Sequence, residues 1–160
     1  MHPNAELIAR FYIAFGKRDP AEMISCYHPD IAFSDPVFPD LRGARAGAMW
    51  QMLCERAEDL SIKYRNVDAD DRIGRAQWEA WYTFSATGRS VHNRIEAQFV
   101  FRDGRIIQHR DSFSFWAWSA QALGTRGVLL GWSSLVKNRV RAQAGKGLEA
   151  FVKRSGVAQP

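Results

Sequence analysis

A histidine and an aspartate stand two residues apart within residues 105–116, a stretch that otherwise reads as a buried strand. Side chains on a strand alternate between its two faces, so His109 and Asp111 share one face with Phe113 and Phe115. Burying a charge without a partner is costly. The pair is therefore either a structural pair that satisfies itself or a working acid/base site.

A second candidate carboxylate, Asp35, precedes a proline within residues 31–38, which read as a short strand. Pro36 cannot donate to a strand ladder and pushes the residue before it toward an extended conformation, so we expect Asp35 at a strand end or kink. Burial among aromatic rings raises the pKa of a carboxyl group, and a nearby carboxylate raises it further. Asp35 and Asp111 can then act as base and acid, with His109 orienting Asp111 or relaying its proton. Alternatively, Asp35 is a turn-former that bonds the local backbone.

Helical spacing dominates the first third of the chain. Apolar residues recur every three or four positions over residues 4–16, with Asn4 as a possible cap and Gly16 as the terminator. The pair Asp19-Pro20 begins a short helix whose apolar stripe extends to Tyr27, and a third helix is expected over residues 44–58.

An alternating pattern follows the third helix. It has period two over residues 60–64 and 76–85, and further strand-like runs cover residues 99–101 and 105–116. Turn residues at Asp70-Asp71, Thr87-Gly88 and Asp103-Gly104 separate these runs. The order predicts three helices followed by four consecutive antiparallel strands.

The chain returns to helical spacing after the last strand. A short helix over residues 119–123, a glycine-containing link over 124–127 and a long helical stretch over 128–154, interrupted by Gly131, Gly145 and Gly147, are expected. Residues 120–160 carry seven Lys and Arg against the single acidic residue Glu149, whereas residues 1–119 carry 15 against 16. We therefore expect a domain of helices and strands over 1–119 and a basic helical extension over 120–160 that packs on the same domain or a dimer partner. This packing is favoured over membrane docking, and no motif indicates nucleic-acid binding.

Composition is typical of one globular domain, because 160 residues with 46% hydrophobic content can bury a sizeable core. No apolar run is long enough to span a membrane, and the first residues lack the order of a signal peptide, so a cytoplasmic location is expected. Cys26 and Cys54 lie in apolar, helix-like surroundings and are expected to be reduced core residues. No metal or cofactor is indicated.

These elements in this order resemble the cone-shaped α+β superfamily that includes nuclear transport factor 2, ketosteroid isomerases and SnoaL-like polyketide cyclases. The resemblance covers residues 5–118. It is carried by residues 16–19, by the run 27–36 ending in Ser34-Asp35-Pro36, by Leu41-Arg42-Gly43 before the third helix, and by Asp103-Gly104 before the last strand. It implies a curved antiparallel sheet wrapped around N-terminal helices to form a cone with an internal pocket. It also implies a homodimer through the convex side of the sheet, where Trp81 and Val100 are expected to project.

The resemblance also assigns site residues. Asp35 matches the general base of ketosteroid isomerases, but Phe11 and Ala97 occupy the positions of their two oxyanion donors, which argues against steroid isomerisation. SnoaL-like cyclases carry an acid/base aspartate on the last strand, often two residues after a histidine, as His109 and Asp111 stand here. The catalytic residues expected are thus Asp35, Asp111 and His109. The ligand-binding residues expected are Phe11, Trp50, Trp78, Tyr82, Phe84, Asn93, Ala97 and Phe113.

The resulting expectation is a SnoaL-like pocket protein, an isomerase or cyclase that acts on an enolisable hydrophobic substrate of polyketide or steroid type. Two alternatives stay open, because one cone fold hosts enzymes and pure binders. One is a non-catalytic module that binds a hydrophobic ligand or a protein. The other is an epoxide hydrolase of the same fold, with one carboxylate activating water and the other donating to the epoxide oxygen.

Overall fold

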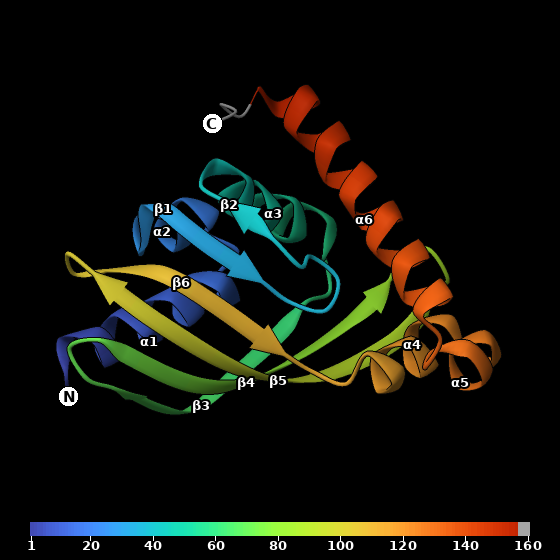
Figure 1. The fold of residues 1–160 in the computed structure, drawn as a ribbon, viewed down its shortest axis with the longest axis horizontal. Coiled ribbons are helices and arrows are strands. Elements are labelled where there is room, and N and C mark those ends of the chain that lie inside the picture. The colour runs from blue at the N-terminus through green and yellow to red at the C-terminus, as the bar shows by residue number, and fades with distance from the viewer. Residues whose placement is uncertain (157–160) are drawn as a thin grey trace.

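A computed structural model describes residues 1–156 as a curved sheet with helices on its concave side and at one end (Figure 1). The N-terminal helices are α1 (Pro3–Gly16), α2 (Pro20–Ser25) and α3 (Ala44–Arg56), with β1 (Tyr27–Ser34) and β2 (Leu41–Arg42) between the last two. The long strands are β3 (Ser61–Ala69), β4 (Ile73–Phe84), β5 (Arg89–Arg102) and β6 (Arg105–Ser112). Three helices follow: α4 (Phe115–Leu123), α5 (Thr125–Leu130) and α6 (Ser134–Ser155).

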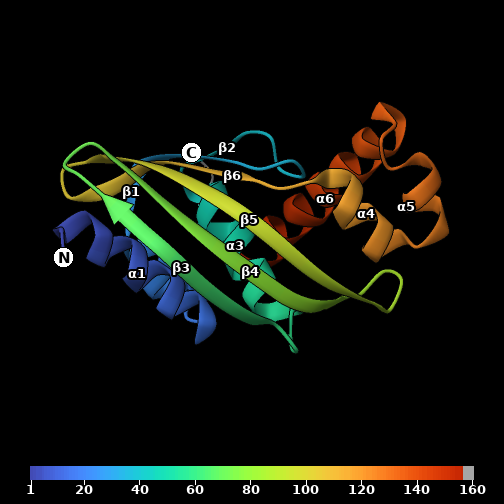
Figure 2. The same cartoon turned by 90° about the horizontal axis from the view of Figure 1, so that it is seen from below.

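The six strands form one sheet in the order β2-β1-β6-β5-β4-β3. Strands β3 to β6 are consecutive antiparallel neighbours, which confirms the predicted meander, while β1 pairs with β6 in parallel. The register places Ala97 opposite Asp111 and Phe99 opposite His109. The face predicted to line the cone is therefore the face that the sheet turns toward α1 and α3 (Figure 2). The expected α+β cone is confirmed.

Aromatic side chains fill the space between the sheet and these helices. Phe11 from α1, Phe33 from β1, Trp50 from α3 and Phe99 from β5 are all buried in one cluster. Ring pairs such as Phe11 and Trp50, with centroids 5.4 Å apart at 84°, pack edge to face. The high aromatic content of the chain is used mainly to make this core.

The structure corrects two local predictions in the first third of the chain. His2 rather than Asn4 caps α1, its side chain accepting a hydrogen bond from the Asn4 N–H. Tyr27 is the first residue of β1 rather than part of the α2 stripe, because its backbone pairs with Ile106 of β6. The strand ends at Ser34, which places Asp35 at the strand end as expected. Helix α2 begins at Pro20 as expected, and Asp19 caps it.

The C-terminal helices differ from the prediction in where they begin. Phe115 was placed on the last strand, but β6 ends at Ser112, and Ser114 caps α4 by accepting a hydrogen bond from Ala117 N–H. The long helical stretch divides into α5 and α6, since Ser133 caps a new helix. Residues 157–160 of the predicted extension lie outside the described residues.

Helix α6 packs on its own chain. Leu148, Phe151 and Val152 belong to the main core cluster, and Arg45 of α3 forms an ion pair with Glu149. Within the described residues, Cys26 and Cys54 are buried free thiols, and no group of three His, Cys, Asp or Glu side chains could hold a metal ion. Among residues 1–156, every helix is too short or too polar to cross a bilayer.

Candidate functional site

His109 lies at the centre of the aromatic core, and its side chain is 0% exposed. The rings of Phe99 and Phe33 approach its centroid to 4.5 and 5.1 Å, and Phe11 and Trp50 lie at 5.5 and 6.1 Å. A ring enclosed in this way has no free face for a ligand. His109 can act only through the groups bonded to its two nitrogens.

A chain of hydrogen bonds runs through those nitrogens. The Trp50 Nε1–H donates to the Tyr27 hydroxyl over 2.9 Å, and this hydroxyl lies 2.7 Å from His109 Nδ1. On the other side, His109 Nε2 lies 2.9 Å from Asp111 Oδ1. A carboxylate accepts only, so Nε2 carries the proton toward Asp111 and Nδ1 accepts the Tyr27 O–H. The chain fixes the orientation of Asp111 from the interior.

The Asp111 carboxylate is anchored through one oxygen. Oδ1 accepts from His109 and, over 3.4 Å, from Trp78 Nε1–H, while Oδ2 bonds no side chain or backbone group within residues 1–156. Tyr12 of α1 lies close enough for the charge of Asp111, together with burial, to raise its pKa well above 10. In the described part of the chain the Tyr12 hydroxyl is a buried polar group without a hydrogen-bond partner. Such unpaired groups are rare and call for an explanation.

Asp35 is held in a similar way at the end of β1. Its Oδ1 accepts from the backbone N–H groups of Val37 and Phe38 over 2.7 and 2.6 Å, and its Oδ2 bonds no described residue. Burial raises the pKa of Asp35 from 3.8 to about 7; the Phe38 N–H bond lowers it and the charge of Asp111 raises it. The turn-former alternative is thus correct in its geometry. The same turn presents a carboxyl group that titrates near neutrality.

The C-terminal helices close the end of the cone where Asp35 lies. The Trp118 Nε1–H of α4 donates to the Tyr82 hydroxyl over 2.7 Å. Burial raises the pKa of Tyr82 above 10, the Trp118 hydrogen bond lowers it, and the charge of Asp35 raises it. The Arg141 Nε–H of α6 donates to the Pro36 carbonyl over 2.8 Å. The extension therefore covers the mouth of the cone in this structure.

The expected ligand-binding residues fall into two groups. The first lies in the main core and is buried: Phe11, Trp50, Trp78 and Ala97. The second is partly buried around Trp118 and Phe115 of α4 and consists of Tyr82, Phe84 and Phe113, with Tyr82 and Phe113 packing on both clusters. Asn93 is partly buried on β5 opposite Ala80. Of the second group, Tyr82 lies within reach of the charge of Asp35.

Four side chains at this site were missed in the sequence. Tyr27 was read as helical, and only its parallel pairing with β6 brings it to His109. Tyr12 follows Phe11 on α1 and was given no role. Trp118 and Arg141 lie on the C-terminal helices α4 and α6, and their contacts join residues 36 and 105 positions apart. A local pattern carries no signal for contacts at that separation.

A curved sheet that wraps its N-terminal helices and holds two carboxyl groups near its open end defines a cone-fold protein. The family model of the SnoaL-like domain matches residues 8–109, so the chain belongs to the SnoaL-like family. No curated protein matches the chain.

Solved structures share this fold at low sequence identity. A candidate SnoaL-like polyketide cyclase from Jannaschia sp. CCS1 aligns with a TM-score of 0.67 at 16% identity, covering 76% of this chain and 92% of that one. A LEH-like epoxide hydrolase from M. tuberculosis aligns at 0.63 and 19%, covering 84% and 95%. TerC, co-crystallised with polyporic acid, aligns at 0.59 and 20%, covering 70% and 92%. At these identities the likeness establishes the fold alone.

Proposed function

We propose that this protein is an acid/base enzyme, an isomerase or cyclase that moves a proton on an enolisable hydrophobic small molecule. One observation carries the proposal: Asp35 and Asp111 are each anchored through Oδ1 and each leave Oδ2 unbonded by the described residues. These two oxygens are the atoms of the carboxyl groups that stay free to meet a ligand. The family and the co-crystal of TerC with polyporic acid support a small organic ligand.

Asp35 is the better base of the two carboxylates. A general base works best when its pKa is near the operating pH, and burial brings the pKa of Asp35 to about 7. Its ionised Oδ2 takes a proton from carbon next to a carbonyl, and the electron pair moves to the carbonyl oxygen. Tyr82 accepts a hydrogen bond from Trp118 and keeps its own proton to donate to that oxygen. Phe11 and Ala97 offer no such donor, so Tyr82 takes this role.

Asp111 exchanges the second proton of the reaction. His109 and Trp78 hold its Oδ1, so the acid form of Asp111 carries its proton on Oδ2. Oδ2 gives this proton to the product carbon or oxygen. Asp35 then loses to solvent the proton that it took, and Asp111 takes one from solvent, so that both groups return to their starting forms. His109 is fully enclosed, so it is a positioning residue that acts through Asp111. Of the two roles that the sequence suggested for His109, orienting Asp111 or relaying its proton, this is the first.

Solvent deuterium exchange tests the proposal directly. The protein is incubated in deuterated buffer with a panel of aromatic 1,3-diketones, and exchange at the acidic carbon is followed by proton NMR. Asp35→Asn and Asp111→Asn are each expected to slow exchange by a factor of about 10² to 10⁴, the usual range for a general acid or base. Asp30→Asn, an exposed carboxylate on β1, is the matched control and should exchange at the wild-type rate. Equal exchange by all four proteins means that the carboxylates do no proton transfer.

The two alternatives predict different results in the same panel. A non-catalytic binder raises its melting temperature with a bound ligand but exchanges no proton above the buffer rate. An epoxide hydrolase, which the pair of unbonded carboxylate oxygens also suits, places labelled oxygen from water in a diol. Arg94 pairs with Glu79 on the outer face over 3.3 Å, so it does not lie between the two carboxyl groups.

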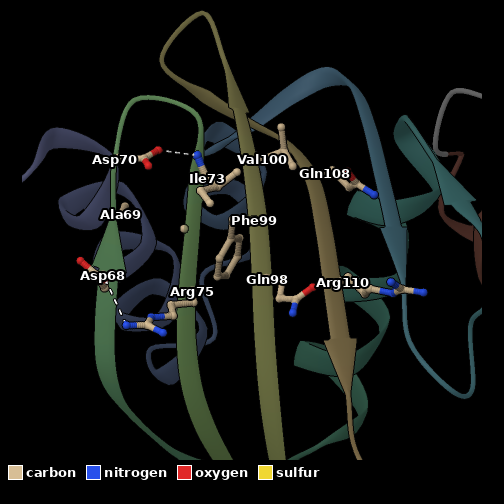
Figure 3. Close-up of a pocket in the computed structure, with 11 residues that line it drawn as sticks. Asp68, Ala69, Asp70, Ile73, Arg75, Gln98, Phe99, Val100, Gln108 and Arg110 are labelled. Atoms are coloured by element: carbon tan, nitrogen blue, oxygen red, sulfur yellow. Dashed lines mark hydrogen bonds and ion pairs between the residues drawn. The ribbon is translucent and has the colours of Figure 1, made fainter.

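We further propose that the convex face of the sheet forms a homodimer contact. A groove of about 530 Å³ lies on this face, lined by side chains of β4, β5 and β6 that include Arg75, Gln98 and Arg110 (Figure 3). Val100 borders it as expected, whereas Trp81 is already covered by His92 stacked at 4.5 Å. Light scattering tests the proposal: a mass of twice 18.2 kDa supports it, and a mass of 18.2 kDa at all concentrations refutes it.

A further inference from the structure

Helix α5 is built with its apolar side chains facing outward. Its Gly127, and Gly131 just after it, lie against Ser119 of α4 so closely that an added Cβ at either glycine would collide with Ser119 atoms. The helix therefore contacts the body of the protein through glycine backbone. Its largest residues, Val128, Leu129 and Leu130, are all exposed. Three consecutive residues span about 200° of a helix, so the outer surface of α5 after Gly127 is apolar.

These residues belong to a larger patch, called here the apolar tip, which consists of Trp116, Val128, Leu129, Leu130, Trp132 and Leu135. Leu129, Trp132 and Leu135 are 63%, 77% and 79% exposed. The tip lies at one end of the molecule, where α4 and α5 project beyond the sheet (Figures 1 and 2). A cluster of large apolar side chains that are this exposed is typical of a surface that binds another protein or a membrane.

The two indoles of the tip are already satisfied within the protein. The Trp116 Nε1–H donates to the Val128 carbonyl over 3.2 Å, and the Trp132 Nε1–H donates to the Leu129 carbonyl over 2.8 Å. Neither ring needs a polar partner at the surface that covers it. The tip is thus a fixed platform of hydrocarbon.

The chain segment that carries the tip has charge of one sign. Between Asp111 and Glu149 it contains no acidic residue and five basic ones, of which Arg126, Lys137 and Arg139 stand within four residues of a tip residue in sequence. Arg126 and Arg139 are exposed beside the apolar residues of α5 and α6. This charge is complementary to an anionic surface. It opposes a second copy of the tip, because two such copies would bring like charges together.

From these observations we propose that the apolar tip docks the protein on an anionic bilayer surface. Val128, Leu129, Leu130 and the two tryptophans enter the boundary between headgroups and acyl chains, and the surrounding arginines and lysines contact the headgroup phosphates. No helix of residues 1–156 is fit to span the bilayer, so the attachment is peripheral. From the sequence alone, packing on the domain or a dimer partner was favoured over membrane docking. The outward-facing side chains of α5 now favour docking of this end of the molecule.

Docking at the tip would also place the candidate functional site near the membrane. Helix α4 carries both Trp116 of the tip and Trp118, which bonds Tyr82 at the mouth of the cone. A protein attached by α4 and α5 therefore holds its mouth near the lipid, where a hydrophobic substrate would concentrate. This consequence rests on the proposed function, whereas the docking itself does not.

Vesicle flotation tests the docking. We expect the full chain to float with vesicles of phosphatidylcholine mixed with phosphatidylglycerol and to stay behind with phosphatidylcholine alone. The double variant Leu129→Ser with Trp132→Ser should bind the anionic vesicles at least about tenfold more weakly, because it removes two inserted side chains. Ile13→Ser removes an apolar side chain that is 46% exposed on α1, far from the tip in sequence, and should bind as the wild type does.

A charge pair completes the design. Arg126→Gln with Arg139→Gln should also weaken binding, and Arg105→Gln, an exposed arginine at the β5–β6 turn, should not. Circular dichroism and melting temperature confirm that each variant is folded. Three results overturn the proposal: no flotation of the wild type, equal flotation with neutral vesicles, or undiminished binding by the folded Leu129→Ser, Trp132→Ser variant. A dimer in solution that this variant abolishes, without vesicle binding, assigns the tip to a second copy instead.

Discussion

Replacing Asp35 with asparagine should change how stability depends on pH. Asparagine has the same shape, and its Oδ1 can still accept the Val37 and Phe38 N–H bonds that hold the turn. It cannot ionise. The variant therefore removes the titration of this one group and leaves the local structure in place.

The sign follows from the two pKa values of Asp35. Burial raises the folded-state pKa to about 7 from 3.8, its usual value and the one expected in the unfolded chain. Below pH 3.8 the group is protonated in both states, so its contribution to stability is fully present. Between the two values only the unfolded chain ionises, so wild-type stability falls as the pH rises and levels off above the folded pKa.

The size of this effect can be worked out from the shift. A difference of about three pKa units at about 1.4 kcal/mol per unit gives a limit of about 4 kcal/mol. Asp35 is only partly buried, and solvent screening reduces the effect, so we expect about 2 to 4 kcal/mol. Asp35→Asn should gain this much stability over the wild type between about pH 4 and about pH 8.

Urea denaturation at a series of pH values measures the difference. The free energy of unfolding of the variant minus that of the wild type is plotted against pH, with Asp30→Asn as the exposed control, which should give a flat line. A flat line for Asp35→Asn as well would mean that Asp35 ionises normally, and the base role proposed for it would lose its support.

Three further changes test the packing around the site. His109→Ala should cost about 3 to 5 kcal/mol in urea denaturation, because it leaves a cavity in the aromatic core and a buried carboxylate without its donor; a cost below about 1 kcal/mol contradicts the hydrogen-bond chain. Arg141→Met removes a charge that lowers the pKa of Asp35, so the midpoint of the pH curve should rise by less than about one unit, and a fall would be inconsistent. Gly127→Ala should lower the melting temperature, because its added Cβ would collide with the backbone of Ser119 and push α5 away from α4. Gly145→Ala should raise the melting temperature, because its Cβ would meet open space and alanine favours the helix.

Much of the fold could be predicted from the sequence, because the patterns that indicate strands and turns are local. Period-two alternation and turn residues predicted the four-strand meander, and the alternation correctly placed His109 and Asp111 on the concave face. Helix ends were less accessible. Ser133 divides the last helical stretch, yet helical spacing continues on both sides of it.

The candidate site was only partly accessible. Asp35, His109 and Asp111 were named from their residue types, and the structure places His109 next to Asp111 and Asp35 within reach of its charge. The division of the aromatic residues into a filled core and a covered mouth was not visible. It depends on which rings meet across the sheet, and that is a property of packing rather than of spacing.

Local sequence therefore determined the strand, its buried face and the pair of ionisable groups on it, since side-chain alternation depends on the backbone alone. Tertiary structure decided what those groups can do. The parallel pairing of β1 with β6 brought Tyr27 to His109, and the return of α4 and α6 brought Trp118 and Arg141 to the mouth. Such contacts form between segments far apart in the chain, where packing of whole faces and not residue pattern selects the partner.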